Sequence, residues 1–194
     1  WEINGMTGAS SRIVNGFLRG NTLEEVIEIY MGDLVGDSVF ERFGSEFPLL
    51  IKFIDAKDTL SIQVHPGDKL ASERHHAWGK TEMWHIIDAA PGAVIYTGFT
   101  KKITREEYLD HVDMKELPLI INSTPVSPGD TFFIPAGMVH SIGAGVLLAE
   151  IQQASDITYR IYDWDRVDSK GKPREMHTEL AVDDPLAFVF SRLG

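Results

Sequence analysis

The chain has 194 residues, carries a formal net charge of −11 at pH 7 and contains no cysteine. This length allows one domain with a core of its own, and the acidic balance argues against a nucleic-acid partner. The absence of cysteine excludes disulfides, a thiolate nucleophile and thiolate metal ligands. Any bound metal would therefore need imidazole, carboxylate or amide ligands.

Neither a membrane-spanning segment nor a secretory signal is visible in the sequence. No apolar run approaches the roughly 20 residues that span a bilayer, and no charged-then-apolar segment follows Trp1. We therefore expect a soluble, cytoplasmic protein. Because the first residue is Trp rather than Met, we also expect that further residues precede it in the natural chain.

Two capping boxes predict short helices. Thr22 with Glu25 forms the first box, and apolar residues follow it at helical spacing, which predicts a helix within residues 21–32. A second box begins at Thr104 and predicts a helix over residues 104–112, laid outside the sheets.

The pattern of the sequence changes after Pro48. Short apolar-rich segments alternate with turn clusters that contain Pro and Gly, as at Pro66, Pro91 and Pro128. This alternation is typical of an all-β sandwich or barrel. The polar stretch 163–178 predicts a long loop.

A strand over residues 59–66 would place Gln63 and His65 on one face, about 7 Å apart along the strand. An amide oxygen and an imidazole nitrogen at this spacing could be two ligands of one metal. On this segment alone, however, the pattern favours the polar, solvent-facing side of an edge strand.

The next candidate strand, residues 79–87, places Glu82 on the same face as Trp84 and Ile86. We expect this face to point inward, and a buried carboxylate is costly unless it is paired or bound to a metal. His85 lies on the opposite face, so we expect it at the surface or in a structural role.

A third segment, residues 129–140, delivers His140 after a Pro-Gly turn. Its pattern of Gly, five residues, Pro, one residue, Gly, two residues and His matches the second sequence motif of the cupin superfamily at every specified position. This resemblance implies a double-stranded jelly roll in which His140 ligates a metal inside the barrel. The pair Gln63 and His65 is similar to the first cupin motif, with Gln in place of its leading His.

Together with Gly-Lys-Thr-Glu at 79–82 and the segment 150–166, these motifs resemble the type I mannose-6-phosphate isomerase family in their order along the chain. The resemblance implies an all-β cupin jelly-roll barrel with one or two short flanking helices. It also implies that residues 1–194 form a single cupin catalytic domain, truncated at both ends, because the family continues into a second, smaller β domain.

The family pattern implies a set of functional residues. One zinc ion per chain would be held by one amide, two imidazoles and one carboxylate, namely Gln63, His65, Glu82 and His140. The amide is the weakest of these ligands. The catalytic residues would be Lys80, Glu150 and Arg160, and the substrate phosphate would be bound by Arg160 and Arg166.

The residues alone leave other interpretations open. Strand alternation places Glu150 and Gln152 on one face and Arg160 on the next strand. Glu150 and Arg160 could then form a buried ion pair that only links two strands. Arg166 lies in the polar loop and could be a solvated charge.

The resemblance implies a metal-dependent aldose-ketose isomerase that interconverts mannose 6-phosphate and fructose 6-phosphate through an enediol. Whether Lys80 or Glu150 moves the carbon-bound proton is left open. The alternatives are a cupin metalloenzyme with iron and oxygen chemistry and a non-enzymatic sugar-binding cupin. Lys80 and the two arginines favour a phosphorylated substrate. We therefore expect a small sugar phosphate as partner, neither nucleic acid nor a membrane, and we infer no oligomeric state.

Overall fold

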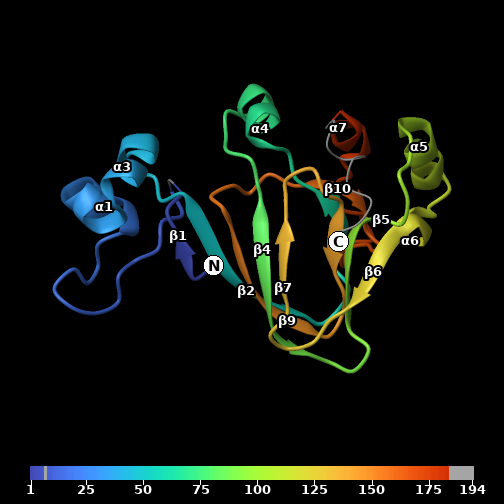
Figure 1. Ribbon diagram of the computed structural model, residues 1–194, viewed down its shortest axis with the longest axis horizontal. Helices are drawn as coiled ribbons and strands as arrows, with labels where there is room; N and C mark the ends of the chain where they lie inside the picture. The colour runs from blue at the N-terminus through green and yellow to red at the C-terminus, as the bar shows by residue number, and fades with distance from the viewer. Residues whose placement is uncertain (7, 184–194) are drawn as a thin grey trace.

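Two antiparallel β-sheets face each other in the computed structural model, which describes residues 1–6 and 8–183. In spatial order, the first sheet contains β1 (Ile3–Asn4), β2 (Leu49–Ala56), β9 (Val146–Gln153), β4 (Glu82–Ala89) and β7 (Thr131–Ile134). The second contains β10 (Tyr159–Tyr162), β3 (Ile62–Val64), β8 (His140–Ile142), β5 (Val94–Phe99) and β6 (Ile121–Pro125). This arrangement (Figure 1) confirms the all-β jelly-roll class that the sequence predicts.

Short helices lie beside the sheets and at the end where β4 begins (Figure 1). They are α1 (Leu23–Tyr30), α2 (Gly32–Val35), α3 (Asp37–Phe43), α4 (Asp68–His75), α5 (Arg105–Asp113), α6 (Leu117–Ile120) and α7 (Thr178–Val182). In the capping boxes of α1 and α5, both reciprocal hydrogen bonds are present, between Thr22 and Glu25 and between Thr104 and Glu107. Within residues 1–6 and 8–183, no helix has the length and apolarity needed to cross a membrane.

The described part of the chain has more short helices than the one or two expected. Helix α4 illustrates the reason, because it follows the Pro66-Gly67 turn and buries only Ala71 among its residues. A helix without an apolar stripe leaves no periodic signal in the sequence. Residues 1–194 as a single domain, truncated at both ends, stay a prediction.

The space between the sheets is apolar in one part and polar at one end. In strand pair β4 and β9, Ile86 lies opposite Leu148, and both side chains belong to a buried apolar cluster. One step toward the α4 end, Trp84 lies opposite Glu150, and one step further Glu82 lies opposite Gln152. All of these side chains are buried. Polar groups are therefore collected at the end of the barrel where β4 begins.

A second apolar cluster covers the outer side of the second sheet. Ile62 and Val64 of β3 pack there against Tyr159 and Ile161 of β10 and against residues of α5, α6 and α7. Because alternate residues of a strand point to opposite faces, the residue between Ile62 and Val64 faces the space between the sheets. This residue is Gln63, and it lies opposite His140 on β8.

Candidate metal centre and active site

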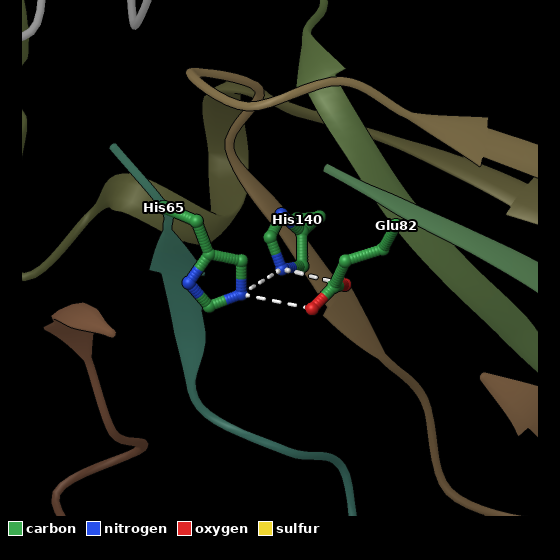
Figure 2. A group of neighbouring side chains, drawn as sticks. All are labelled: His65, Glu82 and His140. Atoms are coloured by element: carbon green, nitrogen blue, oxygen red, sulfur yellow. Dashed lines mark hydrogen bonds and ion pairs between the residues drawn. The ribbon is translucent and has the colours of Figure 1, made fainter. Parts of the chain in front are cut away.

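His65, Glu82 and His140 converge at the polar end of the barrel (Figure 2). His65 directly follows β3, Glu82 begins β4 and His140 begins β8, so that the three side chains lie at the ends of strands from both sheets. One ligand atom of each residue lies within 4.8 Å of the others, and all three side chains are buried. The structure thus brings together these three predicted metal ligands, and the side chain of the fourth, Gln63, contacts His140.

The Pro-Gly turn before β8 sets the position of His140 relative to His65. Gly137 has φ 84°, a left-handed conformation that glycine adopts without strain. Its backbone N–H donates to the carbonyl of His65 at 2.8 Å. The turn that precedes His140 is therefore hydrogen-bonded directly to the backbone of His65.

Both imidazoles are oriented by backbone carbonyls. Nδ1 of His65 donates to the carbonyl of Ile157 at 2.9 Å, and Nδ1 of His140 donates to the carbonyl of Met138 at 2.8 Å. Because a carbonyl only accepts, each ring keeps its proton on Nδ1 and presents the Nε2 lone pair to the centre. The two Nε2 atoms lie 3.2 Å apart. This is the tautomer that metal-ligating histidines use.

Glu82 carries an unsatisfied oxygen at the same point. Its Oε2 accepts from the indole Nε1 of Trp84 at 3.2 Å. Its Oε1 is buried and has no hydrogen-bond partner among the described residues, and it lies 3.3 Å from Nε2 of His65. A buried carboxylate oxygen that accepts no hydrogen bond is costly, and a cation shared with two imidazole lone pairs would remove that cost. The residues present therefore fit a metal ion.

Burial also sets the protonation of the centre. Burial lowers the pKa of His65 to about 3, with a further contribution from the cationic Lys80, and it lowers the pKa of His140 as well. Burial alone would raise the pKa of Glu82, but His65, His140 and Lys80 lower it below its ordinary value. At neutral pH the group is thus a carboxylate with two neutral imidazoles, which is the form that binds metal.

Gln63 lies at the edge of this centre. Its amide Nε2 is 3.4 Å from Nε2 of His140 and is half-buried. An amide ligates a metal through its oxygen, so the amide group would have to turn for Gln63 to act as a ligand. Gln63 as a fourth ligand stays a prediction.

The segment 59–66 contains a strand only over its middle part, β3. The solvent-facing interpretation that this segment alone favours is wrong, because His65 is 1% exposed. The inward orientation of Glu82 is confirmed, since Glu82, Trp84 and Ile86 are all buried, while His85 is exposed and contacts Thr131.

Lys80 and Glu150 flank the centre. The Lys80 side chain is buried, and its Nζ lies 3.6 Å from Oε1 of Glu82 and 3.4 Å from Oγ1 of Thr158. Burial lowers the pKa of Lys80, although Glu82 opposes this shift. Glu150 receives a hydrogen bond from Nε1 of Trp84 at 3.0 Å.

Glu150 and Arg160 do not form the ion pair that the residues alone left open. Glu150 pairs with Lys52, whose Nζ lies 2.8 Å from Oε1 of Glu150. Arg160 lies opposite Gln63 on β10 and donates from Nη1 to the carbonyl of Glu175 at 2.9 Å. Its Nε is buried and has no hydrogen-bond partner in the part of the chain that the structure describes.

Lys52 was not predicted as a site residue. It also donates to the side-chain oxygen of Gln152, so it fastens two polar groups on β9. A signal is present in the sequence of β2, where Leu50, Lys52, Ile54 and Ala56 alternate onto one face. A lysine in an otherwise apolar inward face indicates a buried anionic partner.

Arg166 lies apart from the metal centre. Its guanidinium donates to Oδ1 of Asp163 at 2.6 Å and to the carbonyl of Thr59 at 2.8 Å. Thr59 precedes β3 and His65 follows it, so these contacts are at the opposite end of that strand. Asp163 also pairs with Arg174. The phosphate-binding role of Arg166 stays a prediction.

Comparison with known proteins identifies relatives of this chain. Residues 1–88 match the family model of the phosphomannose isomerase type I catalytic domain. The mannose-6-phosphate isomerase of Streptococcus mutans is 39% identical over 183 residues, which cover 94% of this chain and 56% of that protein. The crystal structure of the mannose 6-phosphate isomerase from Bacillus subtilis has a TM-score of 0.83 and 37% identity, covering 95% of this chain and 57% of that one.

A structure described as zinc-bound mannose 6-phosphate isomerase shares the fold, with a TM-score of 0.68 and 17% identity over 94% of this chain and 64% of that one. The chain spans somewhat more than half the length of the curated relatives it matches most fully. Over the portion that aligns, this chain is therefore similar in sequence and in fold to the type I phosphomannose isomerases.

Proposed function

We propose that this chain carries the metal-dependent catalytic centre of an aldose-ketose isomerase that interconverts mannose 6-phosphate and fructose 6-phosphate. The observation that supports this most directly is the buried group His65, Glu82 and His140, in which two imidazole lone pairs and a carboxylate oxygen that accepts no hydrogen bond among the described residues face one point. Lys80 and Glu150, the two groups that could move protons, lie beside it.

The metal that we propose is zinc, with one ion per chain. His65, Glu82 and His140 would hold it, and Gln63 is the candidate for a fourth ligand. Two imidazoles with one carboxylate form a known set for catalytic zinc, in which one position stays open for water or substrate. When bound there, zinc would act as a Lewis acid that polarises the sugar carbonyl and stabilises negative charge on the sugar oxygens.

The isomerisation requires a proton to move between two neighbouring carbons and another between their oxygens. We propose Glu150 and Lys80 for these transfers. Lys52 and Trp84 donate hydrogen bonds to Glu150 and so hold its carboxylate in a fixed orientation beside the centre. The pKa of Lys80 is lowered by burial, so this ammonium gives up its proton more readily than an exposed lysine.

Arg160 is the residue that we propose for binding the phosphate. It lies opposite Gln63 on the face between the sheets, and its buried Nε has no hydrogen-bond partner among residues 1–6 and 8–183. A guanidinium with free donors suits the oxygens of a phosphate. Arg166 would have to exchange its contacts with Asp163 for the phosphate, so its contribution is expected to be smaller.

The iron and oxygen alternative shares the ligand set, because two histidines and one carboxylate also bind non-haem iron. Lys52 and Lys80 favour the isomerase, since these two cations suit a polar, anionic substrate. A purely sugar-binding protein would gain nothing from burying Lys80 beside a potential metal site. We further propose that the protein acts in the cytoplasm, on a small sugar phosphate.

A coupled assay with mannose 6-phosphate tests the proposal. The chain would be stripped of metal with a chelator and then loaded with zinc or with ferrous iron. We expect product only after metal is restored, with fructose 6-phosphate as the product. Turnover that survives chelation, or oxygen consumption with the iron-loaded protein in place of isomerisation, would reject the proposed function.

A further inference from the structure

The indole N–H of Trp84 lies between two carboxylates. Nε1 of Trp84 is 3.2 Å from Oε2 of Glu82 and 3.0 Å from Oε2 of Glu150. We propose that Trp84 is a positioning residue, which through this single donor fixes the metal-ligand carboxylate and the proton-transfer carboxylate relative to each other. This inference rests on the proposed function, because that function assigns those roles to Glu82 and Glu150.

The position of Trp84 on β4 makes this bridge possible. Glu82 precedes it by two residues on the same inward face, and Glu150 lies directly opposite it on β9. Two carboxylates on neighbouring inward positions repel each other where little water can screen them. A donor placed between them offsets this repulsion at both ends.

The four carboxylate oxygens of Glu82 and Glu150 have different partners. Trp84 donates to Oε2 of Glu82, which lies 3.7 Å from Nε2 of His140, while Oε1 of Glu82 faces Nε2 of His65. Trp84 also holds Oε2 of Glu150, while Oε1 of Glu150 pairs with Lys52. Without the indole donor, either carboxylate could rotate and present a different oxygen to the centre.

The ring of Trp84 is itself held rigidly. The side chain is fully buried, and it belongs to the apolar cluster that includes Ile86 and Leu148. Its ring packs edge-on against the ring of His140, with centroids 5.4 Å apart and an interplanar angle of 78°. Trp84 therefore stands at the boundary between the apolar and polar parts of the barrel, with its polar atom on the polar side.

The test must separate the effect of losing the indole N–H from the effect of changing the volume of the buried side chain. Trp84→Phe keeps an aromatic ring but removes the donor, whereas Ile86→Val removes one buried methyl group from the neighbouring inward position without touching a polar atom. Zinc affinity would be measured by competition with a chelator, and the absorption spectrum of the cobalt-substituted protein would report the geometry of the ligands.

We expect Trp84→Phe to weaken zinc binding by roughly 10–100-fold, the usual effect of losing an outer contact to a metal ligand, and to alter the cobalt spectrum. Its kcat should fall with little change in KM, because Trp84 does not belong to the proposed phosphate site. Ile86→Val should leave all four quantities close to those of the parent chain. Equal metal affinity and spectrum in Trp84→Phe, or equal losses in Ile86→Val, would overturn the inference.

A measurement on the unmodified chain covers the case in which Trp84→Phe does not fold. In nuclear magnetic resonance spectra, the Trp84 indole proton should shift when zinc is added. The indoles of Trp78 and Trp164 are internal controls, because they donate to Glu46 and to the carbonyl of Leu60. A Trp84 signal that zinc leaves in place, in a sample that binds zinc, would also overturn the inference. Absence of isomerase activity in the zinc-loaded parent chain would instead reject the proposed function.

Discussion

Lys52 and Glu150 form an ion pair across strands β2 and β9, with 2.8 Å between Nζ and Oε1, and they are direct partners in the register of the two strands. The Glu150 side chain is 5% exposed and that of Lys52 is 14% exposed, so little water screens the pair. The pair ties the second strand of the chain to the strand that carries the proposed proton-transfer carboxylate. Its loss should therefore affect both stability and activity.

We expect Lys52→Met to destabilise the chain by roughly 3 kcal/mol, because it leaves the carboxylate of Glu150 buried without its cation. Urea unfolding would measure this change. In a double-mutant cycle, Glu150→Gln should recover part of the loss when combined with Lys52→Met, since it removes the unpaired charge. Strictly additive losses would contradict a direct interaction between the two side chains.

Removal of one imidazole from the candidate metal centre gives a second prediction. We expect His140→Ala to weaken zinc binding by more than the roughly 10–100-fold that loss of an outer contact costs, and to abolish most isomerase activity. Zinc content after dialysis and the coupled assay would measure both effects. His85→Ala is the matched control, because His85 is exposed on the opposite face of β4, where its side chain hydrogen-bonds to Thr131. Full activity in His140→Ala would contradict the role of this residue as a ligand.

The grouping of His65, Glu82 and His140 was predictable because each stands in a local sequence motif. Alternation along β4 correctly predicted that Glu82 faces inward with Trp84. The segment around Gln63 did not reveal its burial by itself. That burial comes from contacts distant in the sequence, since His65 contacts the carbonyl of Ile157 and the turn before His140.

The ion-pair partner of Glu150 could not be predicted from local sequence patterns, for a different reason. An ion pair between residues 52 and 150 depends on which strands are neighbours, and the alternation of one strand does not determine its neighbour. For Arg166, sequence gave no means of choosing between a phosphate and Asp163 as partner. The structure shows the contact with Asp163.

The buried histidines predict how the stability of the metal-free chain depends on pH. The pKa of His65 is 6.5 in an exposed reference state and about 3 in the fold, where burial disfavours the cation. As the pH falls from 6.5 toward 3, only the unfolded state takes up this proton. This group should therefore lower the free energy of unfolding by up to about 1.4 kcal/mol for each pH unit below 6.5. Above pH 6.5 the imidazole is neutral in both states, and this loss of stability is absent.

Urea unfolding of the chelator-treated protein across this pH range measures the slope. Other groups also titrate there, so His65→Gln provides the comparison. We expect the variant to show a shallower dependence on pH, because its unfolded state takes up one proton fewer. Parallel curves for the two proteins would mean that His65 titrates normally in the fold.

The phosphate-binding role that we propose for Arg160 gives the last prediction. Loss of a charge-assisted hydrogen bond costs roughly 1.5–3 kcal/mol, so we expect Arg160→Gln to raise KM for mannose 6-phosphate by about 10–100-fold. Catalysis with unphosphorylated mannose should change far less, because that sugar has no phosphate to lose. Arg166→Gln is the comparison, since Arg166 is already engaged by Asp163 and should have a weaker effect. Equal changes for both sugars in Arg160→Gln would assign Arg160 to the sugar ring or to the fold rather than to the phosphate.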